Sequence, residues 1–147
     1  MCPSDQNRVL HPTRIALPLE VRLYVIGLLN QTLACTVDLR LQAKQAAWNV
    51  KGTEVLQLQS LFTAIATELE VYTDLLAERI VILGGVVRTT VHAAAAQSTL
   101  PEYPCTIAEG DAHVLALAER VAHYATTMRG GARRSPNGSH SEGERTG

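Results

Sequence analysis

Apolar residues recur at spacings of three and four over the first long segment of the chain, as they do along one face of an amphipathic helix. The members of this stripe are Leu19, Leu23, Ile26, Leu29, Leu33, Val37 and Leu41. Pro18 suits a first helical turn because its missing N–H would be unpaired there, and Gly52 suits a helix stop. The pattern predicts a helix from Pro18 to Asn49, about 48 Å long at 1.5 Å per residue.

A second stripe of the same kind follows after a short polar connection. Its members are Leu58, Leu61, Ile65, Leu69, Tyr72, Leu76, Ile80 and Leu83. Gly84 and Gly85 end it. Because the connection is so short, the two helices are predicted to fold back on each other as an antiparallel pair.

The regular spacing of apolar residues then ends, and a short alanine-rich segment at 90–97 and a loop that carries two prolines follow. A third long helix is predicted to begin at a capping box made by Thr106 and Glu109. Its apolar stripe is Val114, Leu117, Val121, Tyr124 and Met128. The long connection allows this helix to run parallel to the second one, which is the crossover of ferritin-like bundles. The predicted fold class is therefore all-α, a ferritin-like helical bundle.

The last segment, residues 129–147, breaks with this pattern. It holds five glycines and three serines but no Val, Ile, Leu, Met, Cys or aromatic residue, so it cannot cover a core. We predict a flexible lead at 1–16, one bundle domain at 17–128 and a disordered Gly/Ser/Arg-rich tail at 129–147. A fourth long helix is missing from this prediction, which leaves one side of the bundle open.

Composition narrows the class of protein further. The chain has 147 residues, of which 46% are hydrophobic, and a net charge of −1, so it predicts one packed domain without an overall positive field for nucleic acid. No apolar signal peptide and no membrane-length apolar stretch are found. The scattered Cys2, Cys35 and Cys105 fit neither a zinc site nor a disulfide framework, and free thiols suit a reducing cytoplasm.

Two carboxylates are the first candidate chemical group. Asp74 and Glu78 are four residues apart on the second predicted helix, so both project from one face. Carboxylate oxygens bind cations such as iron or manganese. The alternative is a pair of solvated surface acids.

The histidines are weaker candidates for metal ligands than these two carboxylates. Glu109 with His113, and Glu119 with His123, are also spaced by four, whereas di-iron bundles use Glu-x-x-His, with a spacing of three. We therefore expect surface Glu–His hydrogen bonds. His11 and His92 are expected to be ordinary surface residues, and the single tryptophan, Trp48, to anchor packing or an interface.

The stretch LQAKQAAWNVKG at 41–52 resembles the end of the first helix in Dps proteins, the DNA-binding ferritin-like proteins of starved bacteria. The stretch ERIVILGG at 78–85 is similar to the end of their second helix, and the resemblance extends over 17–128. It implies a bundle assembled into a hollow, usually dodecameric homo-oligomer in the bacterial cytoplasm, in contact with the nucleoid where it binds DNA. Members oxidise Fe(II), store ferric mineral and protect DNA from oxidative stress.

The resemblance also implies an oxidation site at a two-fold interface, where one subunit gives two histidines and an aspartate and the other gives an aspartate and a glutamate. The first set falls on Ala47, Gln59 and Thr63 in this chain, and the second falls on Asp74 and Glu78. Alanine cannot bind a metal, and Gln or Thr offers only neutral oxygens. The predicted iron ligands are therefore Asp74 and Glu78, no catalytic residue is assigned, and Fe(II) oxidation is expected to be impaired. Whether the chain is an enzyme stays open.

An alternative function is that of a non-enzymatic helical assembly subunit, which keeps the family's interfaces without its iron chemistry. The abrupt change of composition after Met128 predicts a truncation or a frame change before the family's last long helix. Without that helix, aggregates or assemblies smaller than a shell are expected. DNA binding is expected to be weak or absent, because the lead carries only Arg8 and Arg14 and the tail has four arginines against two glutamates.

Overall fold

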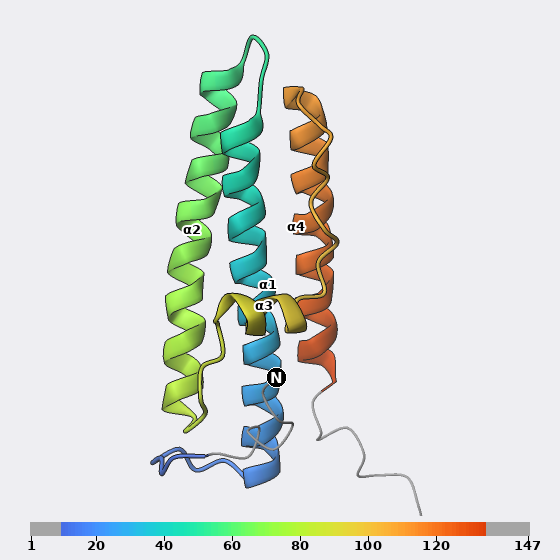
Figure 1. The fold of residues 1–147 in the computed structure, drawn as a ribbon. Coiled ribbons are helices and arrows are strands. Elements are labelled where there is room, and N and C mark those ends of the chain that lie inside the picture. The colour runs from blue at the N-terminus through green and yellow to red at the C-terminus, as the bar shows by residue number, and fades with distance from the viewer. Residues whose placement is uncertain (1–9, 135–147) are drawn as a thin grey trace, which may run out of the picture.

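The computed structural model describes residues 10–134, and all regular elements in this range are helices (Figure 1). They are α1 (Leu19–Asn49), α2 (Val55–Ile82), α3 (Val91–Gln97) and α4 (Gly110–Arg133). The all-α prediction is confirmed, as are the long crossover and the positions of the first two helices. None of the four helices is long and apolar enough to cross a membrane.

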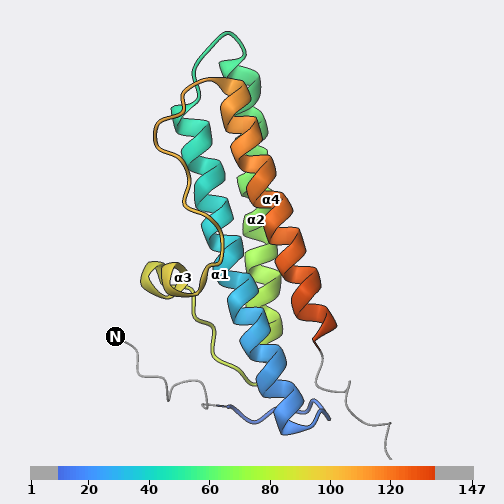
Figure 2. The ribbon, with the colours of Figure 1, turned by 90° about the vertical axis from the view of Figure 1, so that its right-hand side faces the viewer.

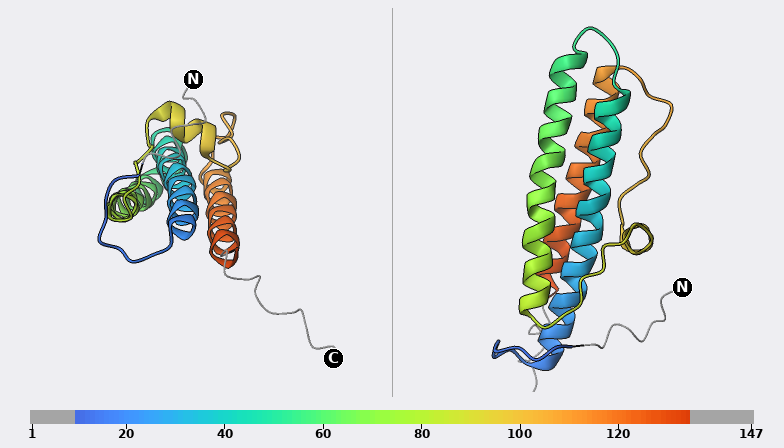
Figure 3. Two further views of the ribbon diagram at one scale, coloured as in Figure 1. Left: turned by 90° about the horizontal axis from the view of Figure 1, so that it is seen from below. Right: turned by 60° about the vertical axis from the view of Figure 1, so that its left-hand side comes forward.

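Helix α1 lies between the other two long helices. It packs antiparallel to α2 on one side and antiparallel to α4 on the other, so α2 and α4 run in the same direction (Figure 1). The short helix α3 and the crossover segment that follows it cover a third side of α1 (Figure 3). In the view of Figure 2, α1 is set back toward α3 relative to α2 and α4, so the three long helices do not lie in one plane.

Two clusters of buried side chains hold the helices together. One, near the α1–α2 turn, contains Ala43, Ala46, Ala47, Val50, Phe62, Ala66, Tyr103, Ala116 and Leu117. The other, near the end of α2, contains Ile26, Leu33, Ile80 and Leu83. Alanines dominate the first cluster on the α1 side, and small side chains allow neighbouring helices to approach closely.

The first described residues are attached to the end of the bundle. The His11 N–H donates to the Gly84 carbonyl at 2.8 Å, and the Thr13 hydroxyl donates to the Ile82 carbonyl at 2.8 Å. Leu10 and Ile15 pack against the second cluster. The prediction of a flexible lead at 1–16 is therefore corrected for 10–16, while 1–9 lie outside the described residues.

Both ends of α4 differ from the prediction. The helix begins at Gly110 after Glu109, whose side chain makes no cap hydrogen bond, so the expected Thr106 capping box does not form. The helix continues to Arg133, five residues beyond its predicted end, because the Gly131 carbonyl accepts a hydrogen bond from Tyr24 of α1 at 3.2 Å. The first part of the predicted tail, 129–133, is therefore helical, and 135–147 lie outside the described residues.

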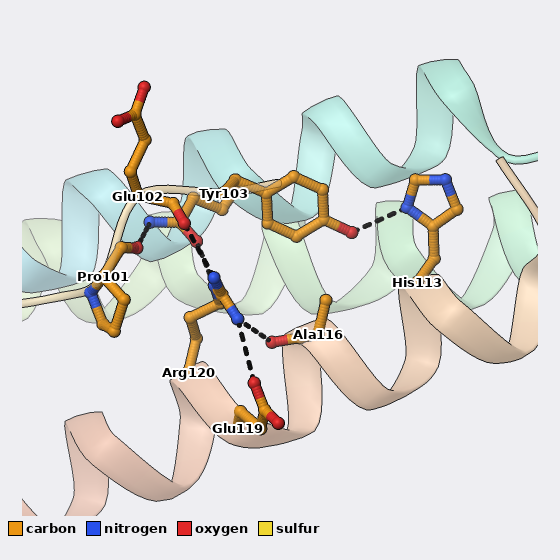
Figure 4. Close-up of polar contacts among 8 residues, drawn as sticks. Pro101, Glu102, Tyr103, His113, Ala116, Glu119 and Arg120 are labelled. Carbon is orange, nitrogen blue, oxygen red and sulfur yellow. Dashed lines mark hydrogen bonds and ion pairs between the residues drawn. The ribbon is translucent and has the colours of Figure 1, made fainter. Parts of the chain in front are cut away.

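A buried arginine attaches the crossover to the bundle (Figure 4). Arg120 of α4 donates to the Gln42 side-chain oxygen of α1 at 3.1 Å and to the Glu102 carbonyl of the crossover at 2.7 Å. It also donates to the Ala116 carbonyl at 3.0 Å and to the Glu119 carboxylate at 3.3 Å. Because nearly all of its donors are used within the protein, this buried charge fixes three segments relative to one another.

His113, two turns nearer the start of α4 than Arg120, is buried with 1% of its surface exposed. Its Nδ1 shares a 2.7 Å hydrogen bond with the Tyr103 hydroxyl (Figure 4), and its Nε2 has no partner among the described residues. The expected surface hydrogen bond with Glu109 is therefore wrong. The centre of the His113 ring lies 6.4 Å from that of Phe62 and 5.9 Å from that of Tyr103. Burial lowers the pKa of His113 below its usual value.

Because the pKa of His113 is lowered in the folded chain, the free energy of unfolding should depend on pH in a definite direction. The unfolded chain takes up a proton on His113 near pH 6.5, whereas the folded chain resists protonation to a lower pH. The free energy of unfolding should therefore decrease as the pH falls below about 6.5. His113→Gln keeps an acceptor for Tyr103 but does not titrate, so denaturant unfolding between pH 7 and 5 should show a flatter pH dependence.

The matched control is His123→Gln, at an exposed histidine on the same helix. An unchanged pH dependence in the His113 variant, or an equal change in the His123 variant, would show that the buried imidazole does not set it.

Candidate functional site

Asp74 and Glu78 lie one turn apart on α2, and both carboxylates are exposed. Neither makes a hydrogen bond or an ion pair with another described residue, in contrast to Glu70 on the same helix, which pairs with Arg40 at 3.4 Å. The structure thus places the predicted pair at solvent-exposed positions of α2.

Gln59 and Thr63 lie near the start of the same helix. Fifteen residues separate Gln59 from Asp74, which is about 22 Å along the helix axis. Gln59 and Thr63 line a shallow groove of about 930 Å³ on the outer surface of α2. The other lining residues are Leu56, Ser60, Ala64, Thr67, Glu68, Val71 and Tyr72. Within one chain, therefore, the two candidate pairs do not meet.

Ala47, the third matched position, lies on α1 and belongs to the first core cluster, with 4% of its surface exposed. It shares this buried cluster with Phe62, and its methyl group offers no donor atom for a metal. The next residue, Trp48, is 69% exposed, and the Lys44 ammonium lies 5.5 Å from the centre of its ring. Trp48 therefore does not anchor the core of its own chain.

No group of three or more His, Cys, Asp or Glu side chains in 10–134 is close enough to hold a metal ion. Cys35 is buried and Cys105 is exposed, and both are free thiols, as expected. The predicted surface positions of His11 and His92 are confirmed. The Glu119 carboxylate pairs with Arg120 at 3.3 Å, which was not expected from its spacing with His123. The described chain by itself supplies a carboxylate pair and no complete metal site.

Arg120 and Tyr103 are among the buried polar residues that the pattern along the chain did not reveal. Arg120 occupies a charged position next to Glu119 and reads as solvated surface, and Tyr103 lies in a proline-containing loop. Their burial depends on partners that are distant in the sequence. Tyr103 shares a hydrogen bond with His113, and Arg120 donates one to Gln42.

Comparisons with known proteins agree with this geometry. A family model described as a ferritin-like domain matches residues 26–128. The chain is 37% identical over 119 residues to a protein of Agrobacterium fabrum called DNA protection during starvation protein, an alignment that covers 81% of this chain and 74% of that protein.

Solved structures with the same fold include DpsC from Streptomyces coelicolor, with a TM-score of 0.80 and 29% identity over 86% of this chain and 74% of that one. The Dps of Mycobacterium smegmatis has a TM-score of 0.80 and 25% identity over 86% of this chain and 72% of that one. The family model covers well over half of the chain, and the curated relative exceeds 30% identity over most of its own length. The chain therefore belongs to the Dps family of ferritin-like proteins.

Proposed function

We propose that this protein binds and sequesters iron in the bacterial cytoplasm and so protects DNA from oxidative stress, with little Fe(II) oxidation of its own. Family membership supports the general role. The observation that carries the proposal is the exposed, unpaired carboxylate pair of Asp74 and Glu78, which faces solvent without a histidine in 10–134 close enough to complete a site.

The spacing on α2 supports a site shared by two copies. The two pairs, 59 with 63 and 74 with 78, have the same internal spacing and are symmetric about the middle of the helix, near Glu68 and Leu69. A two-fold axis at that point pairs α2 antiparallel with α2 of a second copy. Gln59 and Thr63 of one copy then lie opposite Glu78 and Asp74 of the other.

The surface around this axis suits such a pairing. The residues from Ser60 to Thr67 that line the outer groove of α2 are mostly small, which allows a second helix to approach closely. Exposed apolar side chains also line the groove, among them Leu56 and Val71. Burying them on association is favourable by about 25 cal/mol per Å² of apolar surface. We infer that the homo-oligomer is built from this two-fold pair, as the family resemblance implies for a dodecamer.

The chemistry of the shared site is limited by its neutral half. Two carboxylates provide charge and a few oxygen ligands, but Gln59 and Thr63 add only weak neutral oxygens. Ala47 adds nothing, since its methyl group lies in the core. An iron ion held this way keeps much of its shell of water, and a loosely held ion is poorly positioned for electron transfer to an oxidant.

A non-enzymatic assembly subunit is the second candidate. The buried position of Ala47 favours it, because an apolar contact within the chain has taken the place of a metal ligand. On this alternative the carboxylate pair is ordinary solvated surface, and iron has no effect on the protein.

Fe(II) oxidation tests the proposed impairment. The unmodified protein should oxidise Fe(II) at close to the protein-free rate, as followed by stopped-flow absorbance of the ferric product. Gln59→His with Thr63→Asp restores two ligands at partly or fully exposed positions, so it should raise the rate at least tenfold without disturbing the core. Adding Ala47→His should raise it further if the core accepts an imidazole there.

The matched control is Ser60→His with Ala64→Asp, which places the same side chains one residue further along the outer groove. Equal gains in both variants would contradict the proposed pairing of α2 helices, and fast oxidation by the unmodified chain would contradict the impairment itself.

DNA binding is expected to be weak and electrostatic. The net charge of the chain is −1, and few of its positively charged residues are close together in the sequence. Retardation of duplex DNA in a gel should disappear as salt approaches 0.15 M, where the Debye length is about 8 Å. Retention of tight binding at that salt concentration would show a different, non-electrostatic contact.

A further inference from the structure

A cavity of about 530 Å³ lies between α1 and the segment formed by α3 and the crossover. We call it the crossover cavity. Its volume falls within the range of about 300–1,000 Å³ that is usual for small-molecule sites. All of its lining residues belong to α1, to α3 or to the crossover that follows α3. The cavity is therefore separate from the carboxylate pair of α2 and from the groove on the outer surface of that helix.

One part of the lining is aliphatic. Val37 and Leu41 contribute from α1, Val91 and Ala95 from α3, and Leu100 from the crossover. Leu41 is 44% exposed and Val91 is 72% exposed, so both keep apolar surface that packing within the chain does not cover. Such surface in a concave site favours a ligand with a hydrocarbon part, because binding removes apolar surface of both partners from water.

Two carboxylates give the same lining a negative charge. Asp38, half-buried on α1, accepts a hydrogen bond from the Ser98 hydroxyl at 2.6 Å and another from the Gln42 side-chain amide at 3.0 Å. Both donors are neutral, and a carboxylate has about four acceptor positions, so Asp38 keeps capacity for a further donor. The second carboxylate is that of Glu102, which is exposed on the crossover. Figure 4 shows this carboxylate pointing away from the Arg120 guanidinium.

The basic residues of α1 that are closest in sequence to Asp38 have other partners. Arg40 pairs with Glu70 of α2 at 3.4 Å. Lys44 places its ammonium group 5.5 Å from the centre of the Trp48 ring. Neither side chain therefore neutralises the carboxylate of Asp38.

Arg120 contacts the lining but is already paired. Its guanidinium group donates to the side-chain oxygen of Gln42 and to the main-chain carbonyl of Glu102. Its charge is balanced by the carboxylate of Glu119 at 3.3 Å, a residue outside the lining. Among residues 10–134, no ion pair involves Asp38 or the carboxylate of Glu102. The crossover cavity thus carries two carboxylates in excess of its cations, and it attracts a positively charged ligand.

The lining also distinguishes between kinds of cation. A metal ion needs several oxygen ligands and keeps its shell of water where few are offered. No group of three metal-binding side chains in the described part of the chain is close enough to provide them. An ammonium group needs only hydrogen-bond acceptors, and an attached hydrocarbon chain can lie along apolar surface, as the stem of a lysine side chain does. The combination of carboxylates and aliphatic walls therefore favours an organic cation.

We propose that the crossover cavity binds a primary aliphatic amine in its charged, ammonium form. The ammonium group donates hydrogen bonds to the carboxylates of Asp38 and Glu102, and the hydrocarbon chain lies against the aliphatic walls. This site uses none of the residues proposed to bind iron, so the two proposals stand or fall separately.

The test compares three probes of equal chain length, namely hexylamine, hexanol and sodium hexanoate. Titration of the full chain, followed by ligand-observed NMR at neutral pH and constant ionic strength, should show hexylamine binding at millimolar concentrations. Hexanol and hexanoate should bind at least tenfold more weakly, because only the ammonium group is attracted to the carboxylates. Asp38→Asn should weaken the binding of hexylamine at least threefold, and so should Glu102→Gln, which changes an exposed side chain and leaves the hydrogen bonds of Asp38 in place.

Matched control variants separate the cavity from a general attraction to acidic surface. Glu109→Gln with Asp111→Asn removes two exposed acids outside the lining and should leave hexylamine binding unchanged. Ala95→Trp fills the cavity and should weaken binding at least tenfold. Ala96→Trp places the same ring on the next residue of α3, which is exposed and outside the lining, and should bind like the unmodified chain.

Three results would overturn the proposal. Equal binding of hexanol and hexylamine would show that the carboxylates do not select the ligand. Equal losses in the cavity variants and in their controls would show that the amine associates with the acidic surface as a whole. Absence of hexylamine binding to the unmodified chain would show that the cavity is not a site for an aliphatic amine.

Discussion

The packing of α1 against every other element is the constraint on which the structure depends. Helix α1 contacts α2, α3 and α4, and no other helix pair in 10–134 has a comparable interface. Its second half achieves this with buried alanines, including Ala43, Ala46 and Ala47, which let α2 and α4 approach from two sides. One of these alanines, Ala47, also occupies a position where the family resemblance implies a metal ligand. The close packing of the core and the loss of that ligand therefore depend on the same residue.

The family fold and the residues of the site lead to different conclusions about function. A ferritin-like bundle positions side chains for iron chemistry, but function depends on the residues at the site rather than on the fold. Here the fold places Asp74 and Glu78 on the surface of α2, while the positions matched to the other half are neutral or apolar. The structure thus combines a family scaffold with an exposed carboxylate pair and no complete set of ligands in 10–134, and this supports the proposal of sequestration over oxidation.

The long helices and the exposed carboxylates could be predicted from the sequence because their signals are local. Unbroken apolar stripes, Pro18 at one end and the glycines after α2 at the other place both ends of α1 and the last turn of α2 to within about two residues. Asp74 and Glu78 share a face by spacing alone. These features need no knowledge of which segments meet in space.

The crossover contacts could not be predicted, because they depend on tertiary structure. A charged residue on a helix is usually exposed, yet Arg120 is buried since the crossover and α1 supply acceptors for its guanidinium group. His113 is buried for a similar reason, because Tyr103 arrives from the crossover to share its hydrogen bond. The extension of α4 to Arg133 likewise follows from the contact between Tyr24 and Gly131, which are far apart in the sequence.

Anaerobic binding of Fe(II) to the oligomer, measured by calorimetry, tests most directly whether the chain keeps a working carboxylate half-site. The account predicts weak binding of about one ion per chain, which is abolished by Asp74→Ala or Glu78→Ala and unaffected by Glu70→Ala, a change of an exposed acid elsewhere on α2. Tight binding that survives the loss of Asp74 and Glu78, or no binding at all, would contradict it.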